Sequence, residues 1–191
     1  MEFGDRYRFS IALEVDRNCG GPWLFGRFCY WLEGKVVGDY GMGTSLRDIL
    51  FQMKYIIGDR GGRLCPKLLM LPGEKIFGMI SDALDGVSDE ILGYTNQDFL
   101  PARLDVRIPV DVFDCWKIYL VEGVSEAKLL YRSLNSDKLN VTTLNSGEFD
   151  TVFESAYNYI ERLYQEIGDE AGESFRSDNN GTSSDDFFDG S

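Results

Sequence analysis

The chain contains no histidine among its 191 residues. Without imidazole, it has no Ser-His-Asp or Cys-His arrangement and no histidine to exchange protons near neutral pH. Zinc sites built on imidazole are excluded for the same reason. If the protein is an enzyme, its chemistry must depend on carboxylates or on a lone cysteine.

Cysteine is scarce, and the cysteines that are present stand far apart. No two of them form a C-x-x-C pair, which excludes a zinc ribbon and a thioredoxin-type motif. The N-terminal residues 1–6 are mixed and acidic, so no secretory signal is visible. We therefore expect buried or half-buried free thiols at Cys19, Cys29, Cys65 and Cys115.

Long apolar segments are also missing. A run such as Leu68–Leu71 is far shorter than the roughly 20 residues that cross a bilayer. A hydrophobic content of 43% and an aromatic content of 14% can nevertheless fill a core, which excludes wholesale disorder. The sequence therefore predicts a cytoplasmic protein with one folded domain.

Basic residues are few: 19 Lys and Arg stand against 32 Asp and Glu, which gives a net charge of −13. Such a charge disfavours binding along nucleic acid or anionic lipid and suits a basic partner. Acidic residues, Ser, Gly and Asn dominate the last part of the chain. This composition predicts a folded domain over residues 1–168 and a disordered acidic tail over residues 169–191.

The hydrophobic periodicity indicates an α+β protein, in which an antiparallel sheet of hairpins packs with two or three helices. A helix is predicted over residues 46–57, with Ser45 as its N-cap and Gly58 at its end. Further helices are expected near residues 74–84 and from Ser146 to Gly168. Alternating apolar residues and aromatic runs predict strands over residues 7–15, 23–32, 103–109, 115–121 and 126–132.

The strand over residues 23–32 is rich in aromatic side chains, and Glu33-Gly34 after it predicts a tight hairpin turn. We expect the two tryptophans and the neighbouring phenylalanines to be the heaviest contributors to the core. Alternation along the strand places Phe28 and Tyr30 on one face, with Trp23, Phe25 and Trp31 on the other. Aromatic residues outside the core would be natural anchors for a partner.

Two sequence patterns suggest ligand sites but fail on detail. Gly38-x-x-x-x-Gly43-Thr44-Ser45 has the placement of a phosphate-binding loop, yet it lacks the lysine and contains Asp39. The acidic stretch over residues 82–90 lacks the spacing of a calcium loop. No motif therefore predicts a metal ion, a cofactor or a catalytic residue.

The same two regions are candidates for contact with a protein partner. Local negative charge favours Asp82, Asp85, Asp89 and Glu90 as a patch that binds a basic surface. Asp39 and Tyr40 are added because they lie in the loop before the first predicted helix.

Three consecutive motifs carry a resemblance to a known family. They are G-R-F-C-Y-W at residues 26–31, G-x-x-V-G-D-Y at 34–40, and T-S-L-R-D-I-L-F-Q at 44–52. With these motifs, residues 23–54 resemble the immunity protein 42 family of bacterial polymorphic toxin systems. The resemblance implies a stoichiometric antidote without turnover, whose partner is the C-terminal domain of a cognate toxin.

The charge of the chain agrees with that implication, because a toxin that cuts nucleic acid has a basic cleft that an acidic protein can fill. We expect the antidote to occlude the active site of its toxin. Two alternatives stay open from the residues alone: a hydrolase that uses paired carboxylates, and a DNA-mimicking regulator of a basic host protein.

Overall fold

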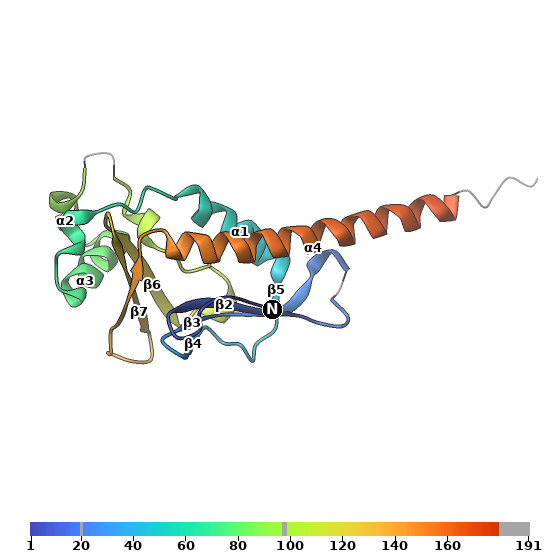
Figure 1. Cartoon of the computed structure of the whole chain (residues 1–191), viewed down its shortest axis with the longest axis horizontal. Helices are drawn as coiled ribbons and strands as arrows, with labels where there is room; N and C mark the ends of the chain where they lie inside the picture. Colours follow the sequence, from blue (N-terminus) through green and yellow to red (C-terminus); the bar gives the residue numbers. More distant parts are fainter. Residues whose placement is uncertain (20, 97–98, 180–191) are drawn as a thin grey trace, which may run out of the picture.

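A computed structural model describes residues 1–19, 21–96 and 99–179, of which Pro22 and residues 168–179 are described as backbone only. This part of the chain contains two sheets, both with antiparallel strand pairing, together with helices, which confirms the predicted α+β class (Figure 1). The helices are α1 (Leu46–Gly58), α2 (Pro66–Leu69), α3 (Gly73–Leu84) and α4 (Glu148–Asn179).

The first sheet has the strand order β1-β2-β3-β4, and β5 pairs with the other end of β3. The second sheet has the order β6-β7-β8. In the first sheet the strands are β1 (Glu2–Gly4), β2 (Phe9–Val15), β3 (Phe25–Leu32), β4 (Lys35–Val37) and β5 (Thr44–Ser45). In the second they are β6 (Trp116–Glu122), β7 (Glu126–Ser133) and β8 (Asn140–Asn145).

The predicted hairpin after the aromatic strand is present. Glu33 and Gly34 connect β3 to β4 with φ angles of 50° and 76°. Positive φ at both central residues is what a two-residue type I′ turn requires, and its twist matches that of the strands. The turn fixes the register in which Leu32 faces Lys35.

The faces of β3 are also as predicted, but the expectation that the tryptophans lie in the core is wrong. Phe28 and Tyr30 are fully buried, whereas Trp23 is 48% exposed and Phe25 43% exposed. Alternate strand residues point to opposite faces, so Phe25 and Trp31 must share the face that points away from the core. Trp23 lies just before the strand, in the short helix η1 (Gly21–Trp23).

Helix α1 forms where the sequence predicts it. The hydroxyl of Ser45 accepts a hydrogen bond from the backbone N–H of Asp48 at 3.2 Å, which caps the first turn. Leu46, Ile49 and Met53 share the buried face. Gly58 is the last residue of the helix instead of the first one after it.

The predicted strand over residues 103–109 is wrong, although its alternation is real. The even-numbered residues of 104–108 are buried, but the segment starts as the short helix η3 (Pro101–Leu104). After that helix, one backbone bond from Val106 N–H to Ile118 O, at 3.0 Å, ties it to β6. Only alternate N–H groups face the partner in an antiparallel pair, and that of Ile108, the next after Val106, donates to no backbone carbonyl of the described β6, so the isolated bridge between Asp105 and Tyr119 does not extend into a ladder.

The chain ends of the fold differ most from the sequence prediction. Strands β1 and β8 were not predicted, because β1 is very short and β8 is mostly polar. Helix α4 does not end at Gly168 but continues to Asn179 (Figure 1). A glycine inside a helix costs only about 1 kcal/mol, and the flanking Ala and Glu residues favour the helix.

Helix α4 runs across the predicted boundary between domain and tail at residue 168. Residues 169–179 of the expected acidic tail lie in α4, and residues 180–191 lie outside the described part of the chain. That residues 1–168 form the folding domain stays a prediction.

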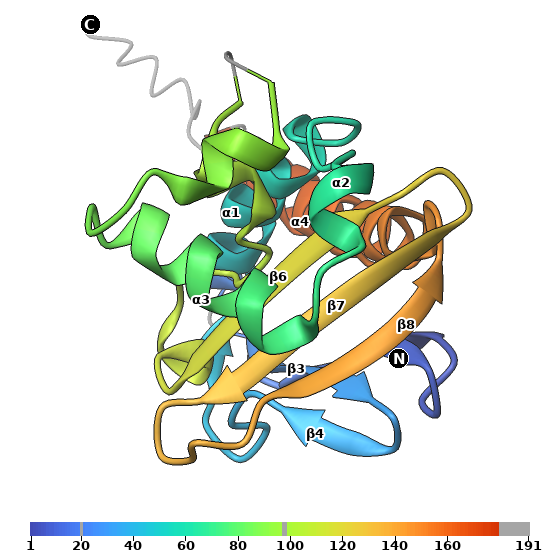
Figure 2. The same ribbon diagram turned by 90° about the vertical axis from the view of Figure 1, so that its left-hand side faces the viewer.

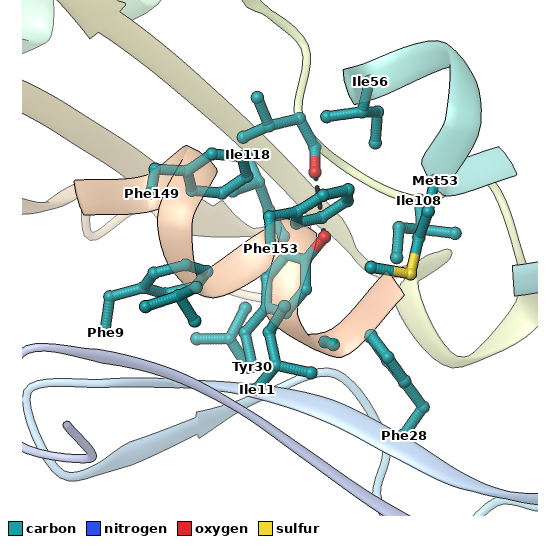
Figure 3. Close-up of a cluster of buried hydrophobic side chains, with 14 of the residues drawn as sticks. Phe9, Ile11, Phe28, Tyr30, Met53, Ile56, Ile108, Ile118, Phe149 and Phe153 are labelled. Atoms are coloured by element: carbon teal, nitrogen blue, oxygen red, sulfur yellow. Dashed lines mark hydrogen bonds between the residues drawn. The ribbon is translucent and has the colours of Figure 1, made fainter. Parts of the chain in front are cut away.

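The main core lies where the inner face of the first sheet meets α1, α4 and the near face of the second sheet (Figure 3). Phe149 of α4 stacks on Phe9 at 4.9 Å and on Phe153 at 5.0 Å between ring centroids. The buried hydroxyl of Tyr30 donates to the carbonyl of Val106 at 3.1 Å, so its polar atom is satisfied.

A second apolar cluster lies on the opposite face of β6 and β7, where α2 and α3 cover the sheet (Figure 2). The rings of Phe77 in α3 and Tyr119 in β6 are 4.9 Å apart, and the Tyr119 hydroxyl lies 3.1 Å from that of Ser81. Both faces of β6 and β7 therefore carry buried residues, whereas alternate residues of β8 are exposed.

A buried arginine connects three elements of the fold. Arg63, between α1 and α2, is fully buried, and its guanidinium pairs with Asp150 of α4. Its Nη1 donates to the carbonyl of Ile56 in α1 at 3.0 Å. Its own carbonyl accepts from the N–H of Glu122 in β6 at 2.9 Å.

Asp150→Asn is expected to lower the free energy of unfolding by about 3–5 kcal/mol, because it leaves the buried Arg63 charge uncompensated. The matched control is Glu154→Gln in the same helix. Glu154 pairs at 2.5 Å with Arg60, whose side chain is 55% exposed, and its loss should cost less than about 1 kcal/mol. Equal losses for the two variants in urea denaturation would contradict this account of the pair.

Candidate functional site

Asp39 and Tyr40, two of the predicted contact residues, lie in the loop between β4 and β5. The exposed Asp39 carboxylate accepts hydrogen bonds from the backbone N–H groups of Gly41 and Met42 at 3.0 and 3.2 Å. Tyr40 is half-buried, and burial, with the nearby Glu14 carboxylate, raises the pKa of its hydroxyl. The aspartate therefore stabilises the turn of its own loop.

The other predicted residues lie at the C-terminal end of α3 and in the segment after it. All four carboxylates are exposed. Asp85 pairs with Lys117 at 3.1 Å, and Glu90 pairs with Lys75 at 3.3 Å. Within the described chain, Asp82 and Asp89 form no ion pair. Lysines thus offset part of the negative charge that the sequence placed here.

The structure links these two groups through residues 111–117. The N–H of Asp39 donates to the carbonyl of Val112 at 2.8 Å, and Lys117 pairs with Asp85. The short helix η4 (Asp111–Phe113) lies between these contacts and adds two exposed carboxylates, Asp111 and Asp114. The sequence does not single out either acid, because only the fold brings them between the predicted groups.

A surface groove runs between α1 and the segment 102–111, and we call it the α1 groove. It consists of two adjoining hollows of about 500 and 230 Å³, which share Gln52 and Pro109. Gly43 and Thr44, from the end of the Asp39–Tyr40 loop, line the larger hollow. Leu84, next to Asp85, lines the smaller one. The groove therefore extends from one predicted group toward the other.

Four carboxylates line the α1 groove, and they differ in their partners. Asp48 accepts hydrogen bonds from Arg47, the nearer at 2.9 Å, and Asp59 lies 3.5 Å from Arg103. Asp105 and Asp111 form no ion pair among the described residues. Arg107 is the one cationic residue among those that line the two hollows.

Asp105 is the most enclosed of these four acids. Burial raises the pKa of its carboxyl, although the N–H of Arg107, which donates to Oδ1 at 3.0 Å, and the nearby Arg107 and Lys117 charges act in the opposite direction. The ionised carboxylate is thus partly desolvated without an ion-pair partner, which is unfavourable for the isolated protein.

Exposed aromatic side chains lie beside the groove. Tyr55 of α1 lines the smaller hollow and is 72% exposed, and Phe25 lines the larger one. Two residues before Phe25, Trp23 stacks under the guanidinium of Arg47 at 3.7 Å. Aromatic residues outside the core agree with the interpretation of these side chains as partner anchors.

The described residues were also compared with the requirements of a metal site, a reactive thiol and a membrane-spanning helix. No three His, Cys, Asp or Glu side chains are placed there to hold a metal ion. The four cysteines are free, and burial raises the pKa of Cys29 to about 12 and of Cys65 to about 11. Cys115 is exposed, so the expectation that it is buried is wrong. None of the described helices is both long and apolar enough to cross a membrane.

The fold is similar to that of a protein of known structure. No curated protein sequence matches the chain. The crystal structure of CdiI from Burkholderia dolosa AUO158 is similar, with a TM-score of 0.64 and 18% identity, over 83% of this chain and 99% of that one. The two proteins share a fold.

The sequence gives a more specific relationship. The family model described as immunity protein 42 matches residues 1–159. The chain therefore belongs to the immunity protein 42 family. This match confirms the resemblance of residues 23–54 and the predicted function, an immunity protein that neutralises a toxin.

Asp105→Asn is expected to raise the melting temperature at pH 7 by roughly 1–3 °C. The raised pKa means that folding favours the protonated carboxyl, so the ionised form weakens folding above that pKa. The gain in melting temperature should vanish near pH 3, where the carboxyl is protonated in both the folded and the unfolded protein. Thermal unfolding at both pH values tests this, with the exposed Asp137→Asn as control. A lower melting temperature at pH 7 would contradict the account.

Proposed function

We propose that this immunity protein acts by stoichiometric binding to the C-terminal domain of its cognate toxin, without catalysis, and occludes the toxin's active site. The observation that carries the proposal is the family match over residues 1–159. The described surface supports it with exposed carboxylates and aromatic side chains on one region, which are features of a protein-binding surface.

The charge of the chain favours a basic toxin surface. With a net charge of −13, the protein is attracted to a basic surface from a distance, which speeds encounter. A nuclease has such a surface, because its cleft binds phosphates. Carboxylates of the immunity protein would then occupy positions that phosphates take in the substrate. We further propose that binding takes place in the cytoplasm.

Co-expression with the toxin domain encoded beside its gene tests the function. We expect cells to survive and the two chains to purify as a one-to-one complex. In a titration of toxin activity, full protection is expected only at an equimolar ratio, because each molecule can cover one toxin. Protection at a small fraction of that ratio would indicate an enzyme, and binding to unrelated basic host proteins would indicate a regulator.

Charge reversal tests the predicted patch at α3. We expect lysine at Asp82, Asp85, Asp89 and Glu90 to weaken toxin binding more than threefold and to reduce its salt dependence. Reversal of four exposed acids elsewhere, at Asp16, Glu126, Asp137 and Glu166, is the control for net charge. The patch is not a contact site if both variants bind alike in calorimetric titration at low and high salt.

A further inference from the structure

We propose that the α1 groove binds an extended basic segment of the toxin, with a lysine or arginine of that segment placed against Asp105. The inference rests on the proposed function, and it names the surface and the chemistry of the partner. It is independent of the α3 patch that sequence analysis selected.

The walls of the groove are fixed by the core beneath it. One wall is a stripe of α1 that continues into its C-cap, in which Asp48, Gln52, Tyr55 and Asp59 recur at helical spacing. The other wall is the segment 102–111. Buried side chains hold the walls together: Met53 and Ile56 of α1 lie in the same cluster as Ile108 of the segment (Figure 3).

The size of the groove suits a peptide segment. The larger hollow, of about 500 Å³, is by itself as large as a typical small-molecule site. The smaller hollow continues it past Gln52 and Pro109, so the combined shape is elongated. An elongated, open groove can receive consecutive side chains of one extended chain.

The charge of the groove selects a basic occupant. Asp105 is partly desolvated and has no ion-pair partner in the described structure. A cation supplied by the partner would therefore offset the unfavourable free energy of desolvating its charge. Asp111 offers a second free carboxylate in the adjoining hollow. Arg107 is turned to another acid, Asp114, at 3.8 Å, and does not pair with Asp105.

The aromatic rim adds to the same preference. Tyr55, which is 72% exposed, offers an aromatic ring on which a lysine or arginine can stack, an attraction of electrostatic origin. Arg47 already stacks in this way on Trp23 at 3.7 Å, at the N-terminal end of α1. A second copy of this chain is a poor occupant, because two molecules with a charge of −13 repel each other.

The test compares two matched double variants of the full-length chain. Tyr55→Ala with Asp111→Lys changes one exposed aromatic and one exposed acid of the groove. Tyr7→Ala with Asp137→Lys makes the same changes at exposed positions that do not line the groove, before β2 and between β7 and β8. Affinity for a catalytically inactive toxin domain is measured by calorimetry, after thermal unfolding confirms that both variants fold.

We expect the groove variant to bind at least tenfold more weakly than the wild type and the control variant to stay within twofold. Asp105→Asn should also weaken binding while it leaves the protein no less stable, which separates a contact from a structural role. If the wild type binds and the groove variant matches the control, the groove assignment is wrong and the proposed function stands. If the wild type itself does not bind, both are overturned.

Discussion

The buried guanidinium of Arg63 is the contact on which the arrangement of the other elements depends. It joins the last turns of α1, the start of α4 and, through its backbone, strand β6. Such a charge is stable in the interior only with its partner Asp150 and its carbonyl acceptor in place. Together with the core contacts of Met53 and Ile56, this joint holds α1, and hence one wall of the α1 groove, in place.

Two enclosed carboxylates of this molecule differ in whether the protein itself supplies a cation to pair with them. Asp150 is buried beside an arginine, so its charge stabilises the fold. Asp105 is less deeply enclosed, has only a backbone N–H as its donor, and forms no ion pair with any described residue. A carboxylate that weakens folding at neutral pH is explained if a partner supplies the missing cation. The groove assignment depends on this contrast.

Local patterns allowed much of the fold to be predicted. The Glu33-Gly34 turn, the Ser45 cap and the strands β2 and β3 depend on neighbours in sequence, and the structure has all of them, although Ser10 and Ala12 on the other face of β2 are buried as well. The strand over residues 103–109 was predicted wrongly because alternation does not reveal whether a strand partner exists. Burial of Arg63 and the groove arise from contacts between residues far apart in sequence, so no local signal could indicate them. The acids at Asp111 and Asp114 were visible in the sequence but their location was not.

Hydrogen–deuterium exchange of the full-length chain, alone and bound to its toxin domain, tests the central claim most directly. The account predicts slower exchange on binding in residues 46–59 and 101–111, the two walls of the α1 groove. The loop over residues 134–139, between β7 and β8, should be unchanged. Protection confined to other surfaces, with α1 and residues 101–111 unaffected in a stable complex, would contradict it.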